Sequence, residues 1–496
     1  MNTTFRHTPL PSVPVATAAP REIAELPSPP GLPWLGNAHQ VRPWSLHRTL
    51  ERWFAELGGP FVMRLGPRRV VVMANAGALQ TALRSRPEQF RRSSPIESVF
   101  AEMGANGVFS VEGPAWNAQR RLVMQALSPA QMRGFHPTLL AITRRLLKRW
   151  AGAAAAGRVV EMTDDLTRYT VDVTTALAFG EDPNTLEHDG DVIQRHLAQV
   201  FPTVMRRVNA PFPWWRHVRL PADRRFDASM AVVHQHVRGL IDRARERRRT
   251  EPAAAPRNVL ESMLVQAASS DSPLSVADVQ ANVITLLLAG EDTTAHTLAW
   301  TLHHLALHPK WQERLHDQAL EVMGDADVCP TLEQLADLDA FEACATEATR
   351  LKPIVPLFYM ETRVEVVLDG IRLPAGTALI CVLRPPMLDE RHFSCANEYR
   401  PERWLATAKG CPAQGARVHD PRAWAQFGAG PRVCPGRHLA GTEIRLVLSM
   451  LVRHFRFEHA VAPASIRERN AFTMAPERMP LRLLPRARQP QLEPMA

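Results

Sequence analysis

The stretch Phe427-Gly-Ala-Gly-Pro-Arg-Val-Cys-Pro-Gly436 decides how the rest of the chain is interpreted. Its single cysteine, Cys434, lies in a segment rich in glycine and proline, which favour tight turns. A helix is expected to begin directly after it, near His438. Backbone N–H groups at a helix N-terminus stabilise an anion, so the thiol is expected to ionise easily. A thiolate in this place is either a nucleophile or a metal ligand.

Taken alone, this loop leaves several interpretations open. A nucleophilic cysteine would need a histidine base and a third orienting group. His438 lies one helical turn further on, and no such triad is evident. A dinucleotide-binding loop would need a glycine at position 433, where valine stands, and a surrounding βαβ unit. A buried cysteine beside a glycine turn, with no chemical task, is the plain alternative.

The pattern F-x-x-G-x-R-x-C-x-G resembles the haem-binding loop of the cytochrome P450s, which are haem-thiolate monooxygenases. The loop residues that carry or accompany the match are Phe427, Gly428, Gly430, Arg432, Cys434 and Gly436. The resemblance implies that Cys434 is the axial thiolate ligand of the iron in haem b. It also implies that Phe427 covers the thiolate and that Arg432 pairs with a haem propionate.

Two further features concern the same cofactor. Trp116 and Arg120 form W-x-x-x-R at helical spacing, for which a surface cation–π pair is the plain alternative. In the family, such a pair donates hydrogen bonds to a propionate. Many members carry another arginine in the strand after E-x-x-R, where this chain has Met360, so anchoring should depend more on Trp116, Arg120 and Arg432. Ala289 stands where some fatty-acid hydroxylases carry a glutamate that bonds to haem, so non-covalent haem is expected.

The motif Glu347-Ala-Thr-Arg350 is by itself typical of a solvated ion pair on a helix. With Arg403 in Pro401-Glu-Arg-Trp404, it resembles the structural triad of the family. The resemblance implies a buried carboxylate shared by two arginines, which fixes the loop that carries Cys434. This role is structural and not catalytic.

Residues Ser275 to about Leu307 predict the longest apolar helix, with a capping-box-like start at Ser275 and Asp278. The polar run 291–294 in its middle is costly in a buried helix unless it finds partners. A kink at Gly290 with threonines bonded back to carbonyls would explain the threonines but not the acids. The run resembles the oxygen-binding groove of the family. The resemblance implies that Asp292 relays protons from solvent and that Thr293 holds the water that donates them.

The remaining pattern predicts a mainly α-helical fold with small β-sheets. We expect one large domain over 26–488, with the long apolar helix over the haem, between a disordered segment 1–25 and a tail 489–496. Strands 61–65 and 70–73 should form a hairpin around 66–69. A helix is expected over 332–351, followed by strands 364–368 and 378–383 with a turn at 370–376.

Composition limits the choice of partners and compartment. The net charge is +9, and arginine supplies most of the 59 basic residues. The arginines are dispersed and there are only 3 tyrosines, which does not resemble a nucleic-acid module. The 6 cysteines form no C-x-x-C pair, which is typical of a reducing compartment. No apolar run is long enough for a transmembrane anchor or a secretory signal, although a transit peptide is harder to exclude. We therefore expect a cytoplasmic protein.

The resemblance covers about 26–486 and implies a soluble monooxygenase of bacterial type. It would insert one oxygen atom from O2 into an apolar substrate, either fatty-acid-like or terpenoid. Electrons would come from a separate ferredoxin or flavodoxin with an NAD(P)H-dependent reductase. An acidic donor protein would dock near Arg121, Arg417, Arg422 and Arg437, although these could also be ordinary solvated arginines.

Substrate contacts are placed by analogy with the family, at apolar positions of which some will be core. They are Met103, Val108, Phe109, Leu288, Ala289, Leu357, Phe358, Phe472, Thr473 and Met474. Two other functions remain open: a peroxide-driven hydroxylase of the same fold, and a non-catalytic haem carrier or gas sensor. Neither would need Asp292 and Thr293, so this pair favours the monooxygenase.

Overall fold

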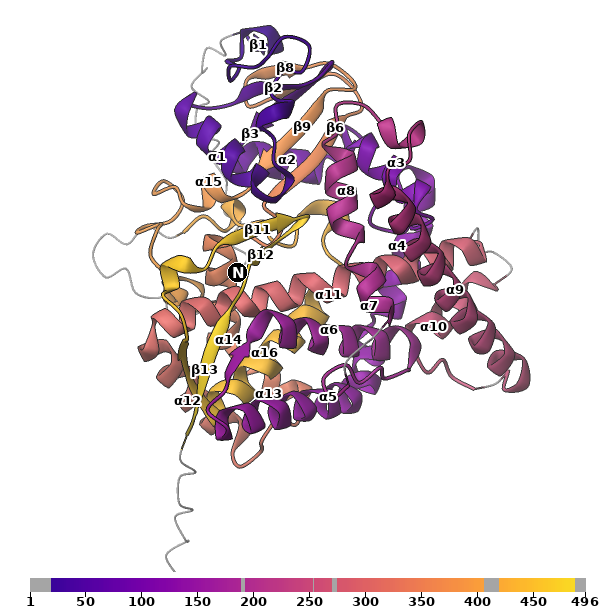
Figure 1. The fold of residues 1–496 in the computed structure, drawn as a ribbon, viewed down its shortest axis with the longest axis vertical. Coiled ribbons are helices and arrows are strands. Elements are labelled where there is room, and N and C mark those ends of the chain that lie inside the picture. Colours follow the sequence, from indigo (N-terminus) through magenta and orange to yellow (C-terminus); the bar gives the residue numbers. More distant parts are fainter. Residues whose placement is uncertain (1–18, 189–191, 253, 270–273, 406–418, 487–496) are drawn as a thin grey trace, which may run out of the picture.

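The computed structural model describes residues 19–188, 192–252, 254–269, 274–405 and 419–486. Figure 1 shows a strand-rich end, where β2, β3, β6 and β9 lie together, and a larger helical part crossed by α11. A mainly helical domain with small sheets is therefore confirmed.

The helices of the described chain include several long ones. They are α1 Leu46–Glu56, α2 Ala76–Arg84, α3 Ser94–Glu102, α4 Pro114–Ala126, α5 Pro129–Ala155, α6 Met162–Phe179, α7 Val192–Leu197, α8 Val200–Val208, α9 Pro221–Thr250, α10 Val259–Ala267, α11 Val276–Leu307, α12 Pro309–Met323, α13 Leu332–Ala336, α14 Asp339–Leu351, α15 Arg384–Met387 and α16 Arg437–His454.

The main sheet has the strand order β2-β3-β9-β6-β4. Its members are β2 Phe61–Leu65, β3 Arg68–Met73, β4 Phe90–Arg92, β6 Leu357–Thr362 and β9 Ala378–Val382. The β2–β3 hairpin is present as predicted, and β3 pairs with β9 in parallel. At the opposite edge β4 runs antiparallel to β6, which places Arg92 directly across from Met360.

Smaller sheets complete the described strands. They are β1 Arg21–Glu22 with β8 Ile371–Leu373 and β7 Val366–Leu368; β5 Val159–Glu161 with β13 Pro480–Pro485 and β10 Phe455–His459; and the hairpin of β11 Glu468–Ala471 and β12 Thr473–Pro476.

Helix α11 belongs to two separate cores. Its start is capped as predicted, because the Ser275 N–H donates to Asp278 Oδ2 at 2.8 Å and the Asp278 N–H donates to Ser275 Oγ at 3.2 Å. Its first half, 279–288, packs into a core with the main sheet, α8 and α9. Its second half, 295–305, packs into a core with α5, α6, α14 and α16. The polar run 291–294 lies at the junction between these cores.

Three predictions of local structure were wrong. Residues 21–25 are ordered, since β1 pairs with β8 and a 3₁₀ turn follows at Ile23–Glu25. The helix expected over 332–351 is interrupted, because Leu338 has non-helical angles (φ −85°, ψ 57°). The turn expected at 370–376 contains strand β8, which pairs with β7. The rest of the N-terminal segment, 1–18, and the tail 489–496 lie outside the described residues.

Among the helices of the described residues, we find none with the length and apolar character needed to cross a membrane. The cytoplasmic location stays a prediction.

Candidate functional site

A cavity of about 320 Å³ lies between the Cys434 loop and the middle of α11. Cys434, Phe427 and Gly428 line it on one side, and Leu288, Ala289, Thr293 and Thr294 of α11 line it on the other. Its described walls are mostly apolar, and most of its charged groups are arginines. The cavity therefore brings the predicted thiolate and the predicted oxygen groove to face each other.

The backbone of the Cys434 loop holds the sulfur at the cavity wall. The Cys434 N–H donates to the Phe427 carbonyl at 2.9 Å, and α16 begins three residues further on. Gly430 has φ +66°, and a Cβ there would lie 2.8 Å from the Leu83 carbonyl oxygen. A side chain at this position would force the loop away from α2, so the glycine is required by close packing.

Burial raises the pKa of the Cys434 thiol above its ordinary value. Backbone N–H groups of Gly436 and Arg437 and the charges of Arg120 and Arg437 act in the opposite direction, but they do not outweigh burial. The prediction of an easily ionised thiol was therefore wrong for the chain without a metal. A bound metal ion ionises a coordinating thiol outright, so the site suits a metal ligand better than a free nucleophile.

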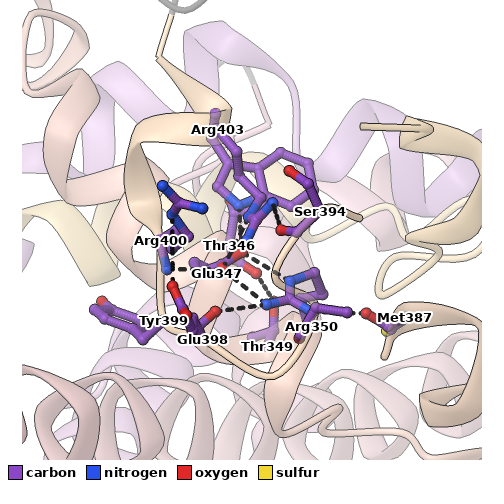
Figure 2. A network of polar contacts seen from close by, with 12 residues as sticks. Thr346, Glu347, Thr349, Arg350, Met387, Ser394, Glu398, Tyr399, Arg400 and Arg403 are labelled. Carbon is purple, nitrogen blue, oxygen red and sulfur yellow. Dashed lines mark hydrogen bonds and ion pairs between the residues drawn. The ribbon is translucent and has the colours of Figure 1, made fainter. Parts of the chain in front are cut away.

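Glu347 and Arg350 on α14 form a buried ion pair, and Arg403 joins it from the 3₁₀ helix Pro401–Trp404 (Figure 2). Arg350 Nε donates to Glu347 Oε2 at 2.9 Å, and its Nη2 donates to Oε1 at 2.8 Å. Arg403 Nε donates to Oε1 at 3.0 Å. The structure thus brings the three predicted triad residues together.

The same guanidiniums also hold the chain that leads to the Cys434 loop. Arg350 donates to the carbonyls of Met387, Ala396 and Glu398, and Arg403 donates to that of Ser394. Each of these carbonyls belongs to irregular chain or a helix end, where no helix or strand partner is available. The triad therefore fixes the path of residues 387–403 from the inside.

Aromatic side chains connect the triad to the cysteine loop. Trp404 Nε1 donates to Glu347 Oε2 at 2.8 Å, and its ring lies 5.9 Å from that of Trp424. The Trp424 ring lies in turn 5.9 Å from the ring of Phe427, in an edge-to-face arrangement. Through these ring contacts the position of Phe427 depends on Glu347, and the Phe427 carbonyl in turn accepts the hydrogen bond from the Cys434 N–H.

One edge of the cavity is strongly basic. Arg86, Arg92, Arg120 and Arg432 all line it, together with Trp116. Glu112 is the carboxylate among them: Arg86 Nη2 donates to its Oε1 at 2.9 Å, and Arg432 Nη2 lies 2.8 Å from its Oε2 without hydrogen-bond geometry.

Two of these guanidiniums have buried nitrogen atoms without a hydrogen-bond partner. The buried Nη1 and Nη2 of Arg432 and the buried Nε of Arg86 have no hydrogen-bond partner. Burial, with the charge of Arg86 adding to its effect, lowers the pKa of Arg432 to about 10. Burial also lowers the pKa of Arg92 well below its ordinary value, with the charges of Arg86 and Arg432 adding to the effect. Buried cations with unpaired N–H donors are costly in free energy, and an anion bound at this edge would lower that cost.

The residues present fit haem b. A flat apolar ring suits the walls, two propionates suit the basic edge, and the thiol of Cys434 suits the iron. Trp116, Arg120 and Arg432 all lie at this edge, and their contact with the propionates stays a prediction. Arg86 and Arg92 were missed, because their place at the edge depends on strand register and loop packing that no local motif reveals. The one signal in the sequence was that Arg92 stands two residues after the apolar Phe90, so that in a strand both side chains lie on the same face.

The middle of α11 presents a hydroxyl to the cavity. Thr293 lines the cavity and donates to the Ala289 carbonyl at 2.7 Å, one turn earlier. Asp292 is not among the described lining residues, and its charge acts on His296, one turn later. The structure thus places Thr293 at the cavity and Asp292 beside it on the helix.

Most of the predicted substrate contacts line the cavity. Those that do are Val108, Phe109, Leu288, Ala289, Leu357, Phe358, Phe472 and Thr473. Met103 and Met474 are not among the described lining residues. Met103 follows the end of α3 and is buried in the first core. Met474 is buried in the second core, because it follows Thr473 on β12 and so points to the other face.

Comparison with known proteins agrees with this site. The cytochrome P450 family model matches residues 26–483. Cytochrome P450 734A6 of Oryza sativa subsp. japonica is 27% identical over 84% of this chain and 79% of its own. The mitochondrial sterol 26-hydroxylase of Homo sapiens is 25% identical over 83% and 79%. The cyclooctat-9-en-7-ol 5-monooxygenase of Streptomyces melanosporofaciens is 27% identical over 87% and 92%.

The chain belongs to the cytochrome P450 family. It is therefore an oxidoreductase of the monooxygenase type that binds haem through a cysteine thiolate. The relatives come from plants, animals and a bacterium, so they do not indicate the origin of this chain.

We predict that Arg92→Met accelerates haem loss. Removing a charged donor from a propionate costs about 1.5–3 kcal/mol, which corresponds to a dissociation about 10- to 160-fold faster. Transfer of haem to excess apomyoglobin measures the rate without reference to activity.

The matched control is Arg91→Met. Arg91 is the neighbour of Arg92 on β4, points to the other face and pairs with Glu97. Haem loss at the wild-type rate in this variant and faster loss in Arg92→Met would support the assignment. Equal rates in the two variants would contradict it.

Proposed function

We propose that this protein inserts one oxygen atom from O2 into an apolar organic substrate bound between the Cys434 loop and α11. The observation that carries the proposal is the cavity itself, with a cysteine on one wall, a threonine hydroxyl on the other and apolar side chains between. Haem, when bound, supplies the activation of dioxygen and the transfer of the oxygen atom.

The side chains of the chain itself have separate tasks. Cys434 ligates the iron, and the basic edge neutralises the propionates, which keeps the cofactor in one orientation. Leu288, Ala289 and Leu357 exclude bulk water from the reacting centre. Thr293 can turn its hydroxyl from the Ala289 carbonyl to a water in the cavity, and Asp292 exchanges protons with solvent beside it.

The names of two relatives support a terpenoid-like substrate more than a fatty acid. One is named for cyclooctat-9-en-7-ol and another for a sterol. Both names describe ring-bearing alcohols. At about 25–27% identity this supports the class of substrate and not a particular compound.

We expect the reduced, haem-loaded protein to give the red-shifted Soret band of a thiolate complex with carbon monoxide. Cys434→Ser should abolish that band, because a serine hydroxyl does not replace the thiolate. Cys344→Ser, at a cysteine buried in the second core, is the control that should keep it. A histidine-type spectrum in the wild-type protein would refute the assignment of Cys434.

Replacing the groove residues should uncouple oxygen consumption from product formation. Thr293→Ala should still bind haem and accept electrons but release peroxide, since the donating water loses its anchor. Asp292→Asn should slow turnover by about 10²- to 10⁴-fold, the range of positioned proton transfer. The ratio of product to NAD(P)H consumed measures both effects. Wild-type coupling in the two variants would refute these roles of Thr293 and Asp292.

The electron donor is proposed to be a separate acidic protein, of the ferredoxin or flavodoxin type, that docks on the Cys434 side. The charge of Arg437 acts directly on Cys434, and Arg121 is exposed one residue after Arg120. Arg422 pairs with Asp420, so it contributes less than expected, and Arg417 lies outside the described residues.

Reduction by such a donor should slow as salt rises, because screening limits charge attraction to about 8 Å at 0.15 M. Arg121→Glu with Arg437→Glu should slow reduction further without changing substrate affinity. Stopped-flow reduction at several salt concentrations provides the measurement. Rates independent of salt and of these charges would place docking elsewhere.

A further inference from the structure

Four phenylalanines form an aromatic roof over the substrate side of the cavity. Phe100, Phe109, Phe201 and Phe472 come from α3, the α3–α4 segment, α8 and the β11–β12 turn, and all line the cavity. The rings of Phe201 and Phe472 are stacked, with centroids 5.0 Å apart and planes 1° apart. Phe109 lies edge-on to Phe472 at 5.6 Å and tilted to Phe100 at 5.3 Å. We call these four residues the phenylalanine roof.

The backbone of Phe472 shows that its ring is held in place. Its φ is +82°, in a region that a bulky residue rarely adopts and that costs free energy. The stack on Phe201 and the contact with Phe109 offset this cost. Because the Phe472 ring of the turn stacks on the Phe201 ring of α8, the roof offers flat aromatic faces, which suit a ring better than a flexible chain.

Beside the roof, one buried hydroxyl has no partner. Thr473 follows Phe472, is 2% exposed and lines the cavity, and its Oγ1 makes no hydrogen bond. Thr285 and Thr297, which also line the cavity, donate to carbonyls of α11 at 2.8 Å each. Burying an unpaired hydroxyl costs free energy. A ligand that forms a hydrogen bond with Thr473 Oγ1 would remove this cost.

Charged groups near the cavity are committed elsewhere. Among the described lining residues, Arg86, Arg92, Arg120 and Arg432 belong to the basic edge. Arg437 and Glu342 lie on the Cys434 side, where Glu342 pairs with Arg445 of α16. The roof itself therefore provides apolar rings and a single hydroxyl, and Arg92, whose guanidinium packs on the Phe109 ring, belongs to the basic edge.

We propose that the substrate is a neutral, ring-bearing molecule with one hydroxyl or carbonyl group, and that this oxygen hydrogen-bonds to Thr473 beneath the phenylalanine roof. The proposal rests on the proposed function, because it takes this cavity as the substrate site. Thr473 would be a specificity residue: it fixes which end of the molecule lies at the roof and so which carbon lies toward Cys434. A χ1 rotation moves the threonine hydroxyl from one staggered position to another without any change of the backbone.

The test compares twelve-carbon probes that differ in one property at a time. Cyclododecanone and cyclododecane differ in the oxygen, cyclododecanone and dodecan-2-one differ in the ring, and dodecanoate adds a charge. Dissociation constants for the haem-loaded protein are measured by titration calorimetry. We expect cyclododecanone to bind more tightly than dodecan-2-one and dodecanoate to bind most weakly.

The variants isolate the hydroxyl. Thr473→Val should reduce the preference for cyclododecanone over cyclododecane by about 2- to 12-fold, the worth of one hydrogen bond. Thr473→Ser should keep the preference. Thr285→Val, which removes an already bonded hydroxyl of the same cavity, should also keep it. The melting temperature of Thr473→Val should be no lower than that of the wild type, because no bond is lost in the free protein.

The outcomes separate this proposal from the proposed function. An unchanged preference in Thr473→Val, or a lower melting temperature, would overturn the role of Thr473. Tighter binding of dodecan-2-one or dodecanoate would overturn the neutral ring-bearing class. Either result could occur in a protein that shows the thiolate carbon monoxide band and couples O2 to oxidation, so the monooxygenase assignment would stand.

Discussion

The ion pair between Glu347 and two arginines is the interaction on which the site depends. Glu347 and Arg350 are fully buried and Arg403 is partly buried, and such a group contributes little net stability compared with an apolar replacement. The ion pair instead fixes geometry, because the hydrogen-bonding groups of one carboxylate and two guanidiniums match in only one arrangement. Once Arg350 and Arg403 are aligned on Glu347, their remaining donors reach the carbonyls of 387–398. An irregular segment thereby obtains a defined path without helix or strand.

A second constraint acts along α11. A helix that is apolar on all sides can be buried throughout, but it then offers no polar group to a cavity. Here the helix passes from one core to the other, and the polar run lies where neither core fills the space. Gly290 permits this, since a Cβ there would lie 2.6 Å from Thr174 Oγ1 on α6. Close packing on one side of the helix and an open cavity on the other arise from the same few residues.

Much of this arrangement could be predicted from the sequence. The Cys434 loop, the capped long helix and the E-x-x-R motif each have a local pattern, and the local pattern determines the local contacts. The predictions that failed concern features that depend on contacts between residues far apart in the sequence. Arg92 lies at the basic edge because β4 pairs with β6 in the register that sets it opposite Met360. Met474 points away from the cavity because side chains alternate between the two faces of β12, and Thr473 before it faces the cavity. The raised pKa of Cys434 depends on burial by the whole fold, which outweighs the helix N-terminus that the sequence shows.

The basic edge connects cofactor binding to the substrate roof. The guanidinium carbon of Arg92 lies 3.7 Å from the centre of the Phe109 ring, and its Nε donates to the Phe109 carbonyl at 2.8 Å. Phe109 in turn contacts Phe472 of the roof. Without haem, the arginines around Glu112 repel one another in a desolvated place, so the edge is least stable when it is empty of propionates. A cofactor that neutralises this charge would stabilise the folded chain by mass action and, through Arg92 and Phe109, would also fix the surface proposed to receive the substrate.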